Sequence, residues 1–307
     1  MYKEIWTIGR ILQWTEQYFQ SKGMDTPRLD GEVLLSHVLG KNRIYLYTNY
    51  DQPLEQEELD RFRPLVIERA KGHSVASLTG TKDFMGLTFA VNDKVLIPRP
   101  DTETLVEYVL SSYHQQDSIR ILDMCTGPGT ILLSLLHYLP TATGMGLDIS
   151  RDALEIATKN QEAFKLENRS EFHESDMFSY LEHHNELFDV IVSNPPYIRL
   201  EDKKILSPDV LNEPHIALFG GEDGLDFYRQ LAMECVKYLK PYGLVAFEVG
   251  YDQAKDVKFL LEAVGSYVDI SFAADLAGIN RVVTARVKGG RMWRLKSLPN
   301  LQEIIFN

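Results

Sequence analysis

The stretch Asp123-Met-Cys-Thr-Gly-Pro-Gly129 joins a predicted strand to a predicted helix. Gly127 and Gly129 let the backbone pass close to a ligand, and the helix that follows presents N–H groups without partners inside the helix. Roughly 20 residues further on, Asp148 ends the next predicted strand, where a carboxylate can accept both ribose hydroxyls of an adenosine-containing cofactor. This spacing predicts a nucleotide-type cofactor at the edge of a parallel sheet.

The spacing alone leaves two cofactor classes open, dinucleotides and S-adenosylmethionine. A dinucleotide turn wants a third glycine three residues after the second, and Leu132 occupies that position. A strand-end Asp123 can instead receive the ammonium end of a methionine moiety. The pattern therefore favours S-adenosylmethionine, with S-adenosylhomocysteine as product, and disfavours an oxidoreductase. The turn residues expected to contact the cofactor are Cys125, Thr126, Gly127, Pro128 and Gly129.

Strands and helices alternate along the chain on both sides of this turn. The predicted strands are 119–123, 144–148, 188–193 and 244–249, and the predicted helices are 130–138, 151–164 and 225–239. This rhythm predicts an α/β fold, a largely parallel sheet covered by helices on both faces. Residues 267–272 and 281–286 are expected to close the sheet as an antiparallel pair.

The first 80 residues show only helical periodicity, and their apolar stripes predict a small bundle with its own core. A hairpin is expected next, with strands 84–91 and 94–97 around the turn residues Asn92 and Asp93. Asp101 or Thr102 is expected to cap a helix reaching about residue 113. The predicted domains are thus 1–80 (helical), 81–100 (hairpin linker), 101–287 (α/β) and 288–307 (basic tail).

Composition excludes several classes of protein. The 307 residues carry a net charge of −12, whereas a duplex-DNA binder needs a basic face. The two cysteines form neither a disulfide framework nor a zinc ribbon, and no His-Glu-x-x-His pair suggests a metal hydrolase, so no metal is expected. The chain has no long apolar run and no signal-peptide segment. We therefore expect a cytoplasmic protein that does not bind membranes or duplex nucleic acid.

A second motif, Ser193-Asn-Pro-Pro-Tyr197, follows directly after an apolar strand. Two prolines remove two backbone donors and lock the turn, which leaves carbonyl oxygens as acceptors. The oxygen of Asn194 and the carbonyl of Pro195 together suit the two hydrogens of a planar –NH2 group, and the Tyr197 ring can stack on it. At the carboxyl edge of a parallel sheet, this motif predicts a site for an amide or an exocyclic amine.

Other signals are weaker. Asp176 is expected to accept from the adenine amine, with Met177 against the ring, although a solvated loop acid is the alternative. Cys125 lies beside the cofactor turn, but no histidine stands next to it, so we interpret it as a packing residue rather than a nucleophile. The segments Glu213-Pro214 and Phe219–Gly224 are expected to be loops, without an assigned chemistry.

In combination these motifs resemble one family, the protein-(glutamine-N5) methyltransferases of peptide chain release factors. The resemblance runs from about residue 5 to 287, and the shared motifs occur in the same order as in the family. These motifs are Leu78-Thr-Gly80, Phe84, Leu96–Glu103, Asp123–Gly129, Asp148, Asn194–Tyr197 and Glu213-Pro214. Cys125 departs from the pattern, because many members have glycine there, and so does Met177, where some have an aromatic residue.

The resemblance implies a small N-terminal helical domain that recognises the substrate, followed along the chain by a seven-stranded Rossmann-like methyltransferase domain that uses S-adenosylmethionine. It implies methylation of the glutamine in the Gly-Gly-Gln motif of a release factor, with Asn194, Pro195 and Tyr197 as catalytic residues. Asn194 would also contact the cofactor. Pro196, Phe84 and Arg99 would join the catalytic residues in binding the substrate.

Two alternatives remain. An adenine-N6 methyltransferase acting on nucleic acid would use the same Asn-Pro-Pro-Tyr motif, but it needs a flipped base and a phosphate-binding surface. An adenosine-binding protein without catalytic activity would have no need of Asn194–Tyr197.

Overall fold

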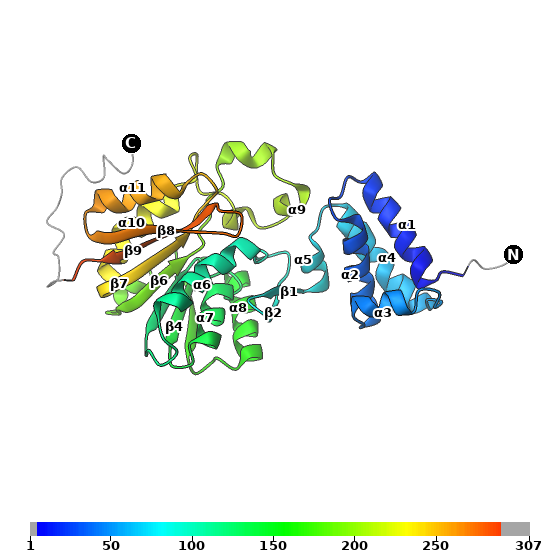
Figure 1. Cartoon of the computed structure of the whole chain (residues 1–307), viewed down its shortest axis with the longest axis horizontal. Coiled ribbons are helices and arrows are strands. Elements are labelled where there is room, and N and C mark those ends of the chain that lie inside the picture. Colours follow the sequence, from blue (N-terminus) through cyan, green and yellow to red (C-terminus); the bar gives the residue numbers. More distant parts are fainter. Residues whose placement is uncertain (1–4, 290–307) are drawn as a thin grey trace. The chain divides into compact units, whose positions relative to one another are not determined.

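The computed structural model describes residues 5–289, so the predicted basic tail lies outside the described residues except for Lys288 and Gly289. By its internal contacts the chain forms two compact units (Figure 1). The first comprises the chain up to Thr81 together with Ser207–Asn212, and the second comprises the rest. The segment Ser207–Asn212, which lies far along the sequence, thus packs with the N-terminal helices.

The first unit is helical. Its helices are α1 (Ile8–Ser21), α2 (Pro27–Leu39), α3 (Arg43–Thr48), α4 (Gln56–Ala70), α5 (Val75–Thr79) and the short α9 (Pro208–Leu211). Its apolar residues form a core of their own, with Phe19 and Leu34 fully buried. Within this core Arg69 of α4 donates to the Asp30 carboxylate of α2 at 2.7 Å, and both side chains are nearly buried. The apolar stripes predicted from the sequence therefore serve to pack the bundle.

The second unit is built on a seven-stranded sheet with the order β5-β4-β3-β6-β7-β9-β8. Its strands are β3 (Arg120–Met124), β4 (Thr143–Asp148), β5 (Ser170–Glu174), β6 (Phe188–Ser193), β7 (Leu239–Glu248), β8 (Tyr267–Ala274) and β9 (Asn280–Val287). Its longer helices are α6 (Glu103–Ser112), α7 (Thr130–Tyr138), α8 (Arg151–Phe164), α10 (Asp226–Tyr238) and α11 (Ala254–Val264). Strands β3 to β7 are parallel to one another, and β9 pairs antiparallel with both β7 and β8. The predicted α/β fold and its closing antiparallel pair are confirmed.

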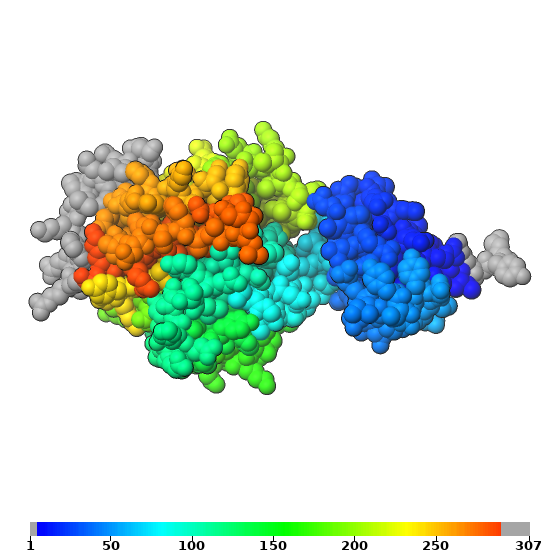
Figure 2. Space-filling model, viewed as in Figure 1, coloured from blue at the N-terminus to red at the C-terminus, as the bar shows by residue number. Residues whose placement is uncertain are grey.

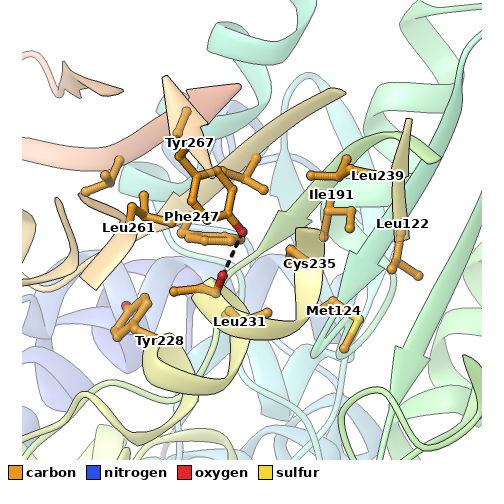
Figure 3. Packing of buried hydrophobic residues seen from close by; sticks show 14 of the residues in the cluster. Leu122, Met124, Ile191, Tyr228, Leu231, Cys235, Leu239, Phe247, Leu261 and Tyr267 are labelled. Atoms are coloured by element: carbon orange, nitrogen blue, oxygen red, sulfur yellow. Dashed lines mark hydrogen bonds between the residues drawn. The ribbon is translucent and has the colours of Figure 1, made fainter. Parts of the chain in front are cut away.

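Alternate residues of the central strands face opposite layers, as a pleated strand requires. On β6, Val190 and Val192 pack with α6 and α7, whereas Ile191 packs with α10 and α11. Figure 3 shows the second of these layers, where the Tyr267 hydroxyl also donates to the Ala232 carbonyl at 2.9 Å. In the space-filling view, α6 (teal) lies beside β8 and β9 (orange to red), which follow it by more than 150 residues (Figure 2).

The predicted hairpin is wrong in register. The paired strands are β1 (Thr81–Phe84) and β2 (Leu87–Ala90), and the turn is Met85-Gly86 rather than Asn92-Asp93. Met85 and Gly86 have φ values of 49° and 72°, the combination that a tight two-residue hairpin needs. The chain at 94–97 forms no strand, because the Ile97 N–H donates to the carboxylate of Glu213 instead.

The predicted helix cap also differs. A 3-10 helix, Pro100–Thr102, leads into α6, and the Thr102 side chain makes no capping hydrogen bond. Its hydroxyl instead accepts from the Asn194 side chain. Among the described residues, none of the helices has the length and apolar character needed to cross a bilayer.

Candidate active site

A cavity of about 240 Å³ opens at the carboxyl ends of the parallel strands of the second unit. Such edges are where ligands bind in open α/β sheets. Most of the predicted site residues line it: Arg99, Cys125, Thr126, Gly127, Pro128, Asp148, Asp176, Met177, Asn194 and Pro196. The remaining predicted residues, Phe84, Asp123, Gly129, Pro195 and Tyr197, do not line it.

The glycine turn wraps one wall of the cavity. Cys125, Gly127 and Gly129 have φ values of 57°, 56° and 78°, so the turn uses the left-handed region three times. A side chain at Gly129 would be crowded, since a Cβ there would lie 3.0 Å from Leu133 Cδ1. Cys125 accepts this conformation without being glycine. Burial raises the pKa of its thiol, which therefore stays protonated and is a poor nucleophile, as the packing interpretation requires.

The carboxylate of Asp148 is fixed by backbone groups. One oxygen accepts from the Gly127 N–H at 2.8 Å and the other from the Ser150 N–H at 2.9 Å. Each oxygen of a carboxylate can accept more than one hydrogen bond, so capacity for two ribose hydroxyls remains. Desolvation raises the pKa of Asp148, although these backbone N–H groups oppose the shift.

Asp123 lies behind the turn rather than in the cavity, so its carboxylate does not line the place expected for the ammonium group. It is fully buried, and one of its oxygens accepts from the Thr126 hydroxyl at 2.6 Å and from the Leu132 N–H at 3.2 Å. The other oxygen has no hydrogen-bond partner among the described residues. Burial raises the pKa of Asp123 to about 7. Asp123 thus ties the turn to the first turn of α7.

The loop after β5 supplies Asp176 and Met177. Ser175 organises it, because its hydroxyl donates to the Met177 carbonyl at 2.6 Å and accepts from the Tyr180 N–H at 3.0 Å. Met177 is nearly buried, whereas Asp176 is exposed at the rim of the cavity. The Met177 thioether lies 3.9 Å from the Cys125 sulfur, so the two departures from the family pattern contact each other.

The Asn194–Tyr197 turn follows β6 and is held at its start by two hydrogen bonds. The Ser193 hydroxyl donates to the Met124 carbonyl at 2.7 Å, and the Asn194 Nδ2 group donates to the Thr102 hydroxyl at 3.3 Å. The Oδ1 atom of Asn194 is buried and has no partner among the described residues. A buried amide oxygen without a partner is costly, so a ligand N–H is the natural group to satisfy it.

Tyr197 differs from its predicted stacking role. Its ring packs against the core cluster of α10 and α11, and its hydroxyl faces the buried carboxyl of Glu248. Burial raises the pKa of the Tyr197 phenol, which keeps it protonated as a donor.

The glycine-rich segment Phe219–Gly224, to which the sequence assigned no chemistry, supports this turn from behind. The Gly220 N–H donates to the Ile198 carbonyl at 3.0 Å. A Cβ on Gly220 would lie 2.4 Å from the Pro196 carbonyl oxygen, so only glycine allows the two backbones to approach this closely. From the other side, the buried Gln253 donates to the Tyr197 carbonyl at 3.0 Å.

Glu213 holds the wall formed by the Pro98–Pro100 segment. Its carboxylate accepts from the Arg99 guanidinium at 2.6 Å and from the Ile97 N–H at 3.2 Å. Arg99 therefore lines the cavity as a paired cation. Phe84 is 2% exposed and packs edge-on against Phe89, with ring centroids 6.2 Å apart, so its position is that of a core residue rather than a substrate contact.

The cavity fits S-adenosylmethionine by the chemistry of its walls. The acids Asp148 and Asp176 suit a ligand with ribose and amine donors, and Ile149 and Met177 add apolar surface. Lys94, a cation at the rim, is paired with Asp152 at 2.9 Å. Among the described residues, no group of acidic, histidine and cysteine side chains is arranged to hold a metal ion.

In sequence the chain is similar to bacterial release factor glutamine methyltransferases. It is 41% identical to that of Geobacter sulfurreducens over 285 residues, which cover 92% of this chain and 98% of the relative. It is 42% identical to that of Clostridium acetobutylicum over 262 residues, covering 85% and 91%. The family model described as the PrmC N-terminal domain matches residues 10–80, and one described as a methyltransferase domain matches 115–250.

Two solved structures each match more than half of this chain. The catalytic domain of hMettl16, solved with an RNA hairpin of the MAT2A 3′UTR, matches 73% of this chain and 81% of its own with a TM-score of 0.54 at 14% identity. A release factor-specific protein-(glutamine-N5) methyltransferase from Alicyclobacillus acidocaldarius matches 62% of this chain and 94% of its own, with a TM-score of 0.39 at 28% identity.

Replacing Asp148 with alanine should weaken binding of S-adenosylmethionine by ~1.5–3 kcal/mol, the range for hydrogen bonds to a charged group. Isothermal titration calorimetry measures this directly. Glu174→Ala is a matched control, because Glu174 lies on the adjacent strand and pairs with Arg151 on the surface. Equal affinities of the two variants would remove Asp148 from the cofactor site.

Asp123 should make the ligand-free protein less stable as the pH rises. The unfolded chain loses this proton near pH 4 whereas the folded chain holds it to about pH 7, so stability falls between these values. Asp123→Asn removes the titration. Between pH 5 and pH 8, denaturant unfolding should show the stability of the variant rising relative to that of the wild type by about 3 kcal/mol, at ~1.4 kcal/mol per pKa unit. Parallel pH profiles would contradict this.

Gly220→Ala should lower the turnover of methyl transfer by tenfold or more, because the new Cβ displaces the Pro196 carbonyl and misplacing a reacting group by ~1 Å can cost ~100-fold in rate. The affinity for S-adenosylmethionine should change much less. Gly278→Ala is the control for backbone strain alone, since its φ is 79° and nothing lies within 4 Å of a Cβ there. Single-turnover assays with both variants check this, and unchanged turnover in Gly220→Ala would show that the support is dispensable.

Proposed function

The chain belongs to the release factor glutamine methyltransferase family, and from this premise we propose that its Asn194–Tyr197 turn holds the substrate amide for methyl transfer. The substrate is the glutamine of the Gly-Gly-Gln motif in a peptide chain release factor, and the methylated atom is its side-chain nitrogen, N5. The observation that carries this proposal is the Asn194 Oδ1 atom, a buried acceptor at the cavity without a partner among the described residues.

An amide nitrogen is a poor nucleophile, because its lone pair is delocalised into the carbonyl. Its two hydrogens need two acceptors on one side of the amide plane. Asn194 Oδ1 supplies one, and the family pattern assigns the other to the Pro195 carbonyl, since prolines leave backbone acceptors without competing donors. Two fixed acceptors raise the electron density on the nitrogen and set its orientation.

Asp148 would hold the ribose of S-adenosylmethionine, and the backbone of 125–129 would hold its methionine portion. The cofactor supplies an electrophilic methyl group on a sulfonium sulfur. No general base is needed at the nitrogen, because an N-methylated amide that still carries both hydrogens is a strong acid. In keeping with this, none of the histidines in the described part of the chain lines the cavity.

The helical unit is the part of the chain to which we assign recognition of the release factor body. Its interior is closed by its own apolar core and by the buried Asp30–Arg69 pair, which leaves its outer surface for a protein partner. A translation factor as substrate supports a cytoplasmic location.

Asn194→Ala should lower single-turnover methylation of a release factor by about 10²–10³-fold, the usual cost of removing one preorganised contact. The affinity for S-adenosylmethionine should change much less, because Asp148 and the glycine turn are intact. Asn194→Asp keeps an acceptor of the same shape and should retain more activity than alanine. Quenched single-turnover assays with labelled cofactor measure the methylation rate of both variants.

A release factor whose Gly-Gly-Gln glutamine is changed to alanine controls for methylation elsewhere, and duplex DNA tests the adenine alternative. Near-normal turnover in Asn194→Ala, or methylation of DNA in preference to the factor, would refute the proposed function.

A further inference from the structure

In the proposed function, the side-chain amide of Asn194 can bind the substrate in only one of its two orientations. Its amide has two ends of almost equal size, but only the oxygen accepts hydrogen bonds. A glutamine amide nitrogen offers only hydrogens, so Oδ1 has to face the substrate and Nδ2 has to face the protein. The structure has this orientation, with Nδ2 donating to the Thr102 hydroxyl at 3.3 Å.

Thr102 reaches this position from a different part of the chain. It is 4% exposed at the junction of the 3-10 helix and α6, and it makes no capping hydrogen bond there. A threonine hydroxyl has one hydrogen to donate and can accept as well. Its oxygen accepts from Asn194, and the carboxyl of Glu248 also faces this hydroxyl.

Glu248 ends β7 and is 2% exposed. The groups that face it are the Thr102 and Tyr197 hydroxyls, the Asp101 carboxylate and the Arg281 guanidinium. Arg281 is shared with Asp101 and Asp275 at 2.9 Å each. The Oε2 atom of Glu248 has no hydrogen-bond partner among the described residues. A carboxylate in this place can only accept, so it fixes which way the Thr102 hydroxyl points.

We propose that Glu248 and Thr102 are positioning residues that set the orientation of the Asn194 amide. The ionised carboxylate takes the Thr102 hydrogen, the hydroxyl oxygen then takes a hydrogen from Nδ2, and Oδ1 is left for the substrate. When the carboxylate is protonated or absent, the Thr102 hydroxyl is free to donate to Asn194. The Asn194 amide then favours the flipped orientation, in which Nδ2 faces the substrate. Two donors, Nδ2 and the substrate amide nitrogen, would then face each other. This inference rests on the proposed role of Asn194.

Full-length Thr102 variants test the relay. Thr102→Val keeps the shape but leaves Nδ2 without an acceptor, and single-turnover methylation should fall about 10- to 100-fold, the range for a buried polar group that loses its partner. Thr102→Ser keeps the hydroxyl and should restore the rate to within about threefold, because the same hydrogen bonds are available. Affinity for S-adenosylmethionine should stay within about threefold of wild type in both variants, since Asp148 is untouched.

The pH dependence of the methylation rate separates the proposed role of Glu248 from a purely structural role, because a purely structural role would not change this profile. Burial raises the pKa of Glu248 to about 7, so the wild-type rate should fall as the pH drops through this value. Glu248→Gln has no titrating group and should lose this inflection, while its rate above pH 7 is below that of wild type. Asp123→Asn is the control for the other buried carboxyl that titrates near pH 7, and it should keep the inflection.

The outcomes separate the two proposals. Loss of methylation in Asn194→Ala together with a normal rate in Thr102→Val overturns the relay and leaves the proposed function standing. A normal rate in Asn194→Ala overturns the proposed function itself. If Thr102→Val does not fold, Glu248→Gln decides the matter, because an inflection near pH 7 that persists in this variant overturns the relay.

Discussion

The proposed site depends on one constraint: each buried N–H donor of the substrate amide needs a buried acceptor in the protein. An amide nitrogen brings two hydrogens into a cavity of about 240 Å³. Every group meant to meet them has to be an acceptor, because two donors facing each other in a dry site are each left unsatisfied. In the proposed function this acceptor is the Asn194 Oδ1 atom, which is buried without a partner among the described residues.

The sheet supplies that support by bringing distant segments to one edge. Strand β6 pairs with β3 on one side and with β7 on the other, so the residues that follow these three strands are neighbours. The glycine turn after β3, the Asn194 turn after β6 and Glu248 at the end of β7 come together in this way. Gly220 and Gln253 then fix the backbone of the Asn194 turn from behind.

The sequence alone predicted those parts of the site whose signals are local. The glycine turn, the strand-end Asp148 and the Asn194 turn each combine residue type with position after a strand, and the structure brings them to one cavity. Thr102 and Glu248 could not be assigned in this way, because Thr102 meets Asn194 only through a tertiary contact across 92 positions of the chain, and Glu248 faces Thr102 across 146 positions. The sequence predicts ligand contacts for Asp123 and Tyr197, whereas neither lines the cavity, because the position of a residue in the sequence does not reveal which way its side chain packs. The hairpin was shifted because Asn92-Asp93 has typical turn residues, whereas Met85 enters the left-handed region within a turn held by Glu103 and Tyr138.

A crystal structure with S-adenosylhomocysteine and a release factor is the most direct test of the central claim, that Asn194 binds the substrate through its oxygen. The account predicts the glutamine nitrogen within hydrogen-bond distance, ~2.7–3.2 Å, of both Asn194 Oδ1 and the Pro195 carbonyl. It also predicts that Asn194 Nδ2 still donates to Thr102. A glutamine bound through its carbonyl oxygen to Asn194 Nδ2, or held away from this turn, would contradict it.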